Sequence, residues 1–208
     1  MIVLGLTGSI AMGKSTAADL LRRLGVAVHD SDAAVHRIMG RGGAAIPAVA
    51  EAFPGVVVEG AIDRAKLGAR VFGDRQALRR LERILHPLVR ASADRFLKTM
   101  ARHHRRFVAL DVPLLFETGG ERRCDRTIVV WSPAFLQRQR FLCRPGMTEE
   151  RLAQVRRQQM PVRLKRRKAD AAIASGLGRR ETYLGLKRVL RRWRHDRPRV
   201  WSPAYRRR

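Results

Sequence analysis

Short apolar runs alternate with helical patterns along the chain, which is typical of an α/β fold with a parallel sheet. The run at 2–6 is bounded by glycine, at Gly8, and predicts a buried strand. Apolar residues then recur at helical spacing from Ala17 to Leu24 and stop at Gly25, which predicts a helix. Further strands are expected where similar apolar runs occur, at 26–29, 107–111, 127–131 and 169–173.

The link between the first strand and the first helix carries the clearest chemistry. It reads Gly8-x-x-x-x-Gly13-Lys14-Ser15, and strand, glycine-rich loop and helix in this order are the context of a phosphate-binding P-loop. Glycine lets backbone N–H groups turn around a phosphate, and a helix N-terminus attracts the same anion. Lys14 is expected to reach the β- and γ-phosphates, and the Ser15 hydroxyl to bind Mg²⁺. The predicted nucleotide contacts in this loop are Gly8, Ala11, Met12, Gly13, Lys14, Ser15 and Thr16.

Two carboxylates, Asp30 and Asp32, follow the second predicted strand. Ligands of an open parallel sheet bind beyond the carboxyl ends of its strands, so these side chains would face the phosphates held by the P-loop. A carboxylate there can accept a proton from an attacking hydroxyl, and strand alternation would put both acids on one side. The alternative is that Ser31 or Asp32 only caps the following helix. The residues alone do not choose between these interpretations.

Residues 40–103 form a predicted, mostly helical insertion, which suits a substrate-binding module of a P-loop kinase. Glycine and proline interrupt 40–60, and helical patterns follow up to residue 100. His86 precedes Pro87, which disfavours helical backbone, so a helix is expected to end there. Arg64 is either an ordinary exposed arginine or a phosphate contact.

The strand at 107–111 ends at Asp111 and matches a Walker B pattern, in which the acid supports Mg²⁺ directly or through water. An apolar turn with Pro113, Leu114 and Glu117 follows it. Two basic helices are then expected within 135–159, the second capped by Thr148.

These two helices look like a lid. Arg140 and Arg144 are four residues apart and are expected to share a helix face, from which an arginine could stabilise the charge of a transferring phosphoryl group. For Arg138, Arg156 and Arg157 we prefer a solvated basic face. A last helix is predicted at 181–193, and the basic stretch 194–208 is expected to be a mobile tail.

Composition limits the alternatives. A chain of 208 residues with 45% apolar residues suits one α/β domain with insertions, and no apolar run approaches the ~20 residues of a membrane span. The net charge of +26 indicates either a nucleic-acid partner or a polyphosphate substrate on an arginine-rich protein. We prefer the second, because no nucleic-acid-binding module is present. The two cysteines form no metal or redox motif, which indicates reduced thiols in a cytoplasmic protein.

Taken together, these segments resemble the dephospho-coenzyme A kinase family from about residue 2 to 190. The P-loop is common to many families, whereas the acidic pair, the His-Pro step and the Asp-x-Pro-Leu-Leu-x-Glu segment are more specific. The resemblance is carried by 6–8 with 13–16, 28–32, Asp63-Arg64 with Leu67 and Phe72, 85–88, 111–117, Gln137-x-x-Arg140-x-x-x-Arg144, Gln159, and Ala169-Asp170 with Ile173.

The resemblance implies a P-loop kinase domain, 1–193, of three parts. These are a three-layer core with a parallel sheet (1–39, 104–134 and 169–193), the helical substrate-binding insertion (40–103) and a helical lid (135–168). It also implies ATP and Mg²⁺ on the donor side and the ribose 3′-hydroxyl of dephospho-CoA as acceptor, in the last step of coenzyme A synthesis.

The same resemblance implies residue roles. Asp32 becomes the preferred general base, above Asp30; Lys14 and Arg140 join it as catalytic residues, and Arg144 is the second nucleotide-binding arginine of the lid. Residues expected near the acceptor are Asp30, Asp32, Arg64, His86, Asp111, Pro113, Leu114 and Glu117, and the expected metal ligands are Ser15 and Asp111.

Two departures from the family pattern bear on the site. Ala11 stands where the family usually has glycine, which is acceptable if its φ stays negative. Ser175 stands where the family usually has asparagine, which leaves side-chain contacts to adenine open. The alternatives are another small P-loop kinase, for a nucleoside monophosphate or a shikimate-like acceptor, or a nucleic-acid-binding ATPase. A GTPase is disfavoured, because no Asn-Lys-x-Asp run is present.

Overall fold

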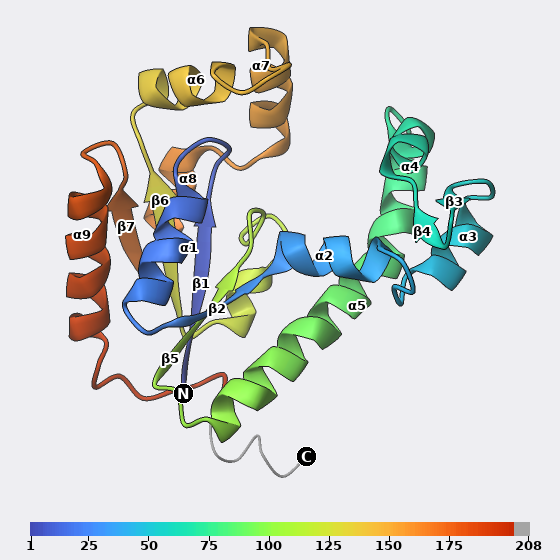
Figure 1. The fold of residues 1–208 in the computed structure, drawn as a ribbon. Coiled ribbons are helices and arrows are strands. Elements are labelled where there is room, and N and C mark those ends of the chain that lie inside the picture. The colour runs from blue at the N-terminus through green and yellow to red at the C-terminus, as the bar shows by residue number, and fades with distance from the viewer. Residues whose placement is uncertain (202–208) are drawn as a thin grey trace. The chain divides into compact units, whose positions relative to one another are not determined.

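The chain divides into two compact units. The computed structural model describes residues 1–201. The first unit comprises Met1–His29 and the chain from Met100 onward, and the second comprises Asp30–Thr99 (Figure 1). Within residues 1–201, no helix is both long enough and apolar enough to cross a membrane.

The first unit is built on a five-stranded sheet of order β2-β5-β1-β6-β7 (Figure 1). The central strand β1 pairs in parallel with β5 and β6, and β6 pairs in parallel with β7. This confirms the predicted α/β class with a parallel sheet. The strands are β1 (Ile2–Gly8), β2 (Ala27–Asp30), β5 (Phe107–Asp111), β6 (Arg126–Trp131) and β7 (Ala171–Ala174).

Helices α1 and α9 supply the main apolar cover of this sheet. Every residue of β1 is buried, as expected for a central parallel strand. Leu21 of α1 and Leu186 of α9 join the same core cluster as the strand side chains, and both are fully buried. The helices of the first unit are α1 (Lys14–Arg23), the 3₁₀ turn η1 (Gly120–Arg123), α6 (Ala134–Leu142), α7 (Glu149–Gln158), α8 (Val162–Lys168) and α9 (Arg179–Arg192).

The second unit has its own apolar core, which includes Ile38, Val49, Phe53, Ile62 and Leu67. The prolines of 40–60 were expected only as breaks in secondary structure. Pro47, however, lies in the first turn of α3, where its missing N–H costs no hydrogen bond. A small antiparallel hairpin, β3–β4, was also not predicted. The elements are α2 (Ser31–Met39), α3 (Ile46–Ala52), β3 (Val57–Val58), β4 (Ala61–Ile62), α4 (Arg64–Val71) and α5 (Arg75–Arg102).

The expected helix end at His86 is wrong. Helix α5 runs unbroken from Arg75–Arg102 with Pro87 inside it. Both residues of the His-Pro step are exposed, so water can satisfy the carbonyl that proline leaves without an N–H donor. Apolar residues continue at helical spacing on both sides of the step, and their burial outweighs the local preference for extended backbone.

Part of the predicted mobile tail is fixed on the core. The buried carboxylate of Asp125 accepts hydrogen bonds from the backbone N–H groups of Val3 (2.7 Å), Arg199 (2.5 Å) and Val200 (2.8 Å). Asp196 accepts a hydrogen bond from Nε of Arg126 at 2.8 Å, and this bond raises the pKa of the guanidinium. The expectation is therefore corrected for 194–201, while 202–208 lies outside the described residues.

Replacing Asp125 by asparagine is expected to lower the free energy of unfolding by about 1.5–3 kcal/mol, because the amide replaces a charged acceptor and turns one donor toward backbone N–H groups. The midpoint of urea unfolding measures this change. Asp19→Asn, which alters an exposed carboxylate paired with Arg22, is the matched control and should shift the midpoint little. An unchanged midpoint in Asp125→Asn would contradict the structural role of this carboxylate.

Candidate active site

The P-loop joins β1 to α1 and leads into the N-terminus of that helix. Gly13 is the N-cap of α1, in left-handed backbone (φ 83°), and no side chain of residues 1–201 caps the helix. The first helical hydrogen bond runs from Ala17 N to Gly13 O, so the amides of Lys14, Ser15 and Thr16 lie ahead of the helical ladder. Together with the helix dipole, these N–H groups form an anion-binding end.

Ala11 differs from its expectation. Its φ is +57°, in the left-handed region, rather than the negative value at which alanine would carry no strain. This conformation costs a non-glycine residue roughly 1–2 kcal/mol. The alanine methyl is buried in a cluster with Phe141 and Leu152, which offsets part of that cost.

Lys14 and Asp111 lie together, as their predicted roles require. Lys14 Nζ is 2.8 Å from Asp111 Oδ1, and the carboxylate side chain is 4% exposed. The register of β1 and β5 explains this approach, because Leu6 lies opposite Asp111 and places the end of β5 beside the start of the P-loop. The ion pair holds the lysine ammonium at the loop.

The residues predicted to bind Mg²⁺ fit it in chemistry. Asp111 offers carboxylate oxygens and Ser15 an exposed hydroxyl at the start of α1, and both are oxygen donors of the kind that Mg²⁺ prefers. Within residues 1–201, no three His, Cys, Asp or Glu side chains come together to hold a metal. A site with few protein ligands is usual for Mg²⁺ that is shared with substrate phosphates.

Arg140 reaches the P-loop through Ser175. Its guanidinium donates to Ser175 Oγ at 3.2 Å and to Ser175 O at 3.0 Å, and Ser175 Oγ donates to Met12 O at 2.8 Å. A Cβ on Gly13 would lie 2.9 Å from Ser175 Oγ, so glycine is needed there for space as well as for its positive φ. The structure thus brings three predicted nucleotide contacts, Met12, Gly13 and Arg140, to one serine.

Arg140 and Arg144 were expected to share a helix face, but they do not. Helix α6 ends at Leu142, and Arg144 is exposed in the following turn. The second lid helix begins as predicted, with the Thr148 side chain accepting from Arg151 N.

Three residues at the P-loop were not assigned a role from the sequence. Gln137 Nε2 donates to Ile10 O at 2.9 Å, and Ile10 N donates to Gln159 Oε1 at 3.0 Å. Arg156, which was interpreted as part of a solvated basic face, is exposed, but it also donates to Gln137 Oε1 through Nε at 3.0 Å and Nη2 at 2.7 Å. The signal available in the sequence was that Gln137 and Gln159 both lie in segments matching the family.

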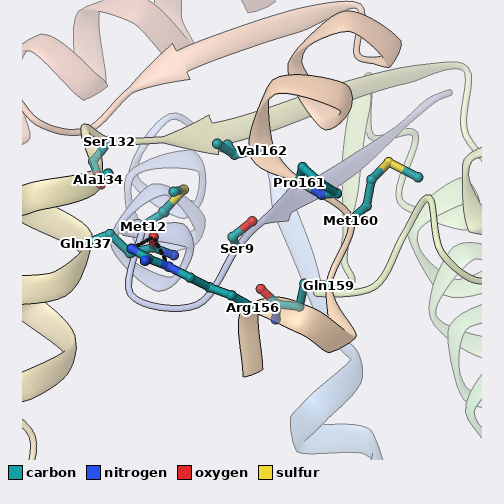
Figure 2. A pocket seen from close by; sticks show the side chains of 10 residues that line it. All are labelled: Ser9, Met12, Ser132, Ala134, Gln137, Arg156, Gln159, Met160, Pro161 and Val162. Atoms are coloured by element: carbon teal, nitrogen blue, oxygen red, sulfur yellow. Dashed lines mark hydrogen bonds between the residues drawn. The ribbon is translucent and has the colours of Figure 1, made fainter. Parts of the chain in front are cut away.

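A pocket of about 340 Å³ opens beside the P-loop (Figure 2). Figure 2 shows the side chains of Gln137 and Arg156 meeting in this pocket. Ser132 Oγ is buried there and has no hydrogen-bond partner within residues 1–201. The lining residues are Ser9, Met12, Ser132, Ala134, Gln137, Arg156, Gln159, Met160, Pro161 and Val162.

The segment after Asp111 is fixed by a buried lysine. Lys165 of α8 is completely buried, and its Nζ lies 2.9 Å from Glu117 Oε1 and 3.1 Å from Pro113 O. The same carboxylate oxygen accepts from Met160 N at 2.8 Å, and Thr7 Oγ1 donates to Pro113 O at 2.9 Å. Glu117 and Pro113 were expected near the acceptor, and both are engaged here by other elements of the protein.

The two acids after β2 take different roles in the second unit. Asp30 is the N-cap of α2 and accepts from Ala33 N at 2.9 Å, so the cap is neither Ser31 nor Asp32. Asp32 lies in the first helical turn, so strand alternation does not apply to it. Its side chain is exposed, and no hydrogen bond or ion pair holds its carboxylate within residues 1–201.

The remaining predicted residues occupy exposed positions. Arg64 opens α4, which is capped by Asp63, and its guanidinium lies 2.9 Å from Nε2 of His36. His86 is exposed within α5. Leu114 is 38% exposed in the turn after β5.

The comparisons with known proteins point to one family. The family model described as "Dephospho-CoA kinase" matches residues 2–178. The dephospho-CoA kinase of Rhodospirillum rubrum is 56% identical over 211 residues, covering 97% of this chain and 99% of that protein. The dephospho-CoA kinase of Paramagnetospirillum magneticum is 63% identical over 161 residues, covering 77% and 76%.

A solved structure supports the same fold. The crystal structure of TT1252 from Thermus thermophilus has a TM-score of 0.79 and 36% identity, covering 92% of this chain and 97% of that one.

Proposed function

Because the chain belongs to the dephospho-CoA kinase family, we propose that this site transfers the γ-phosphoryl group of ATP to the ribose 3′-hydroxyl of dephospho-CoA, giving coenzyme A and ADP. This is the last step of coenzyme A synthesis. The observation that carries the proposal is the P-loop with Lys14 held 2.8 Å from Asp111, within a chain that matches the family over residues 2–178.

On the donor side, the chain binds and orients the triphosphate. The amides at the start of α1 donate to the phosphates, and Lys14 exchanges part of its contact with Asp111 for the β- and γ-oxygens. Arg140, held by Ser175 next to Gly13, adds positive charge where the phosphoryl group transfers. Ser15 and Asp111 would hold Mg²⁺, which neutralises phosphate charge when bound.

On the acceptor side, Asp32 is the proposed general base. Its carboxylate is exposed and without a partner in the described chain, whereas Asp30 is occupied as a helix cap. A free carboxylate can accept the proton of a ribose hydroxyl as the oxygen attacks phosphorus. Asp30, Arg64, His86, Pro113, Leu114 and Glu117 stay predictions as acceptor-side residues, as Arg144 does on the nucleotide side.

We also propose a cytoplasmic location and the division into core, substrate-binding insertion and lid. Cys124 and Cys143 are free in the structure, which suits a reducing compartment. Burial raises the pKa of the Cys124 thiol to about 12, so this thiol stays protonated and unreactive near neutral pH.

The deciding experiment incubates the protein with ATP, Mg²⁺ and dephospho-CoA and follows coenzyme A by mass spectrometry. We expect stoichiometric coenzyme A and ADP. Parallel reactions with a nucleoside monophosphate or shikimate as acceptor, and with RNA or DNA in place of an acceptor, test the alternatives. No coenzyme A at saturating substrates, together with nucleic-acid-stimulated ATP hydrolysis, would overturn the proposal in favour of the ATPase that the +26 charge suggested.

A further inference from the structure

Two glutamines hold both polar groups of one P-loop residue. The Ile10 N–H donates to Gln159 Oε1, and the Ile10 carbonyl accepts from Gln137 Nε2. We propose that Gln137 and Gln159 are positioning residues, which keep the P-loop in its phosphate-binding conformation. This inference rests on the proposed function, in which that loop binds ATP.

The contacts act directly on the strained part of the loop. The Ile10 carbonyl belongs to the peptide plane between Ile10 and Ala11, so its direction follows the φ angle of Ala11. Gln137 therefore stabilises the orientation that accompanies φ +57° at Ala11, a value that alanine rarely adopts. Gln159 holds the preceding peptide plane through its N–H, and the two side chains together fix consecutive planes of the loop.

The orientation of the Gln137 amide is itself determined. Its Oε1 accepts two hydrogen bonds from the Arg156 guanidinium, at 3.0 and 2.7 Å (Figure 2). This leaves Nε2 to donate to the Ile10 carbonyl. A flipped amide would place an N–H group against a cation and an oxygen against a carbonyl, and would lose both sets of hydrogen bonds. The side chain is 3% exposed, so water cannot readily replace these partners.

The holding residues come from the predicted lid. Gln137 lies on α6, Arg156 on α7, and Gln159 is the C-cap of α7. Phe141 of α6 and Leu152 of α7 also pack on the Ala11 methyl. The segment 134–159 thus carries every side chain named here that fixes residues 10 and 11, and the geometry of these two helices controls the loop.

The test measures ATP affinity by calorimetry without any acceptor, so its outcome does not depend on coenzyme A formation. Gln137→Ala and Gln159→Ala are each expected to weaken ATP binding by about 3- to 10-fold. Gln139→Ala and Gln158→Ala, exposed neighbours on the same helices, are the matched controls and should leave it unchanged. Gln137→Glu keeps the size of the side chain and its contact with Arg156 but loses the donor to Ile10, so it should also weaken ATP binding. This variant provides the test if Gln137→Ala does not fold.

A second variant separates positioning from plain stability. Glycine takes positive φ freely, so Ala11→Gly is expected to recover at least half of the lost binding energy in the Gln137→Ala background and to change little in the wild type. Unchanged ATP affinity in Gln137→Glu, or the same effect of Ala11→Gly in both backgrounds, would overturn the proposal. Failure of the wild type to make coenzyme A, with ATP binding intact, would instead count against the proposed function.

Discussion

Asp32→Asn is expected to lower kcat for coenzyme A formation by about 10²- to 10⁴-fold, the usual contribution of a general base. The change keeps the size of the side chain and removes only the proton acceptor. Because Asp32 is exposed and has no hydrogen-bond or ion-pair partner within residues 1–201, stability and ATP affinity should stay close to those of the wild type. Steady-state assays with mass detection of coenzyme A measure kcat, and calorimetry measures ATP binding.

The control for Asp32→Asn is Asp19→Asn, another exposed carboxylate, on α1. It should retain wild-type kcat. If kcat of Asp32→Asn also stays within threefold of the wild type, Asp32 is not the base. A loss of ATP affinity as large as the loss of kcat would indicate damage to the nucleotide site rather than to proton transfer.

Lys165→Met is expected to lower the free energy of unfolding by about 3–5 kcal/mol. The lysine is completely buried, and its removal leaves the largely buried Glu117 carboxylate without its cation. Met has a similar length, so the loss reports the charge and its hydrogen bond to Pro113 O rather than a cavity. Urea unfolding measures the effect.

Two further variants test this explanation. Lys168→Met removes an exposed ammonium from the same helix and should cost less than 1 kcal/mol. The double variant Lys165→Met/Glu117→Gln should have a higher free energy of unfolding than Lys165→Met alone, because no uncompensated charge remains. A double variant that is less stable than Lys165→Met would show that the buried charge is not the cause.

The predictions that succeeded depend on neighbouring residues in the chain. The P-loop, the strands and the Thr148 cap each depend on a few consecutive positions, and Thr148 shows how a local pattern fixes a helix start. Even the approach of Lys14 to Asp111 follows from two local patterns, because parallel strands bring their carboxyl ends to one edge.

The predictions that failed depend on contacts distant in sequence. The geometry of Pro87 predicted a helix break, but α5 is continuous because its apolar residues pack in the core of the second unit. Lys165 was given no role from the sequence, and only the packing of α8 brings its side chain to Glu117. A hydrophobic or basic pattern identifies a face of an element but not the partner that covers it.

The sequence by itself determined the fold class, the nucleotide-binding loop and the family, because these rest on residue types at fixed local spacing. The tertiary structure determined the backbone conformation of the loop. Ala11 takes a positive φ, against its intrinsic preference, where Gln137 and Gln159 hold the adjoining peptide groups and Phe141 and Leu152 pack on its methyl. A backbone conformation that no single residue favours needs several distant contacts to hold it, and a linear pattern does not record them.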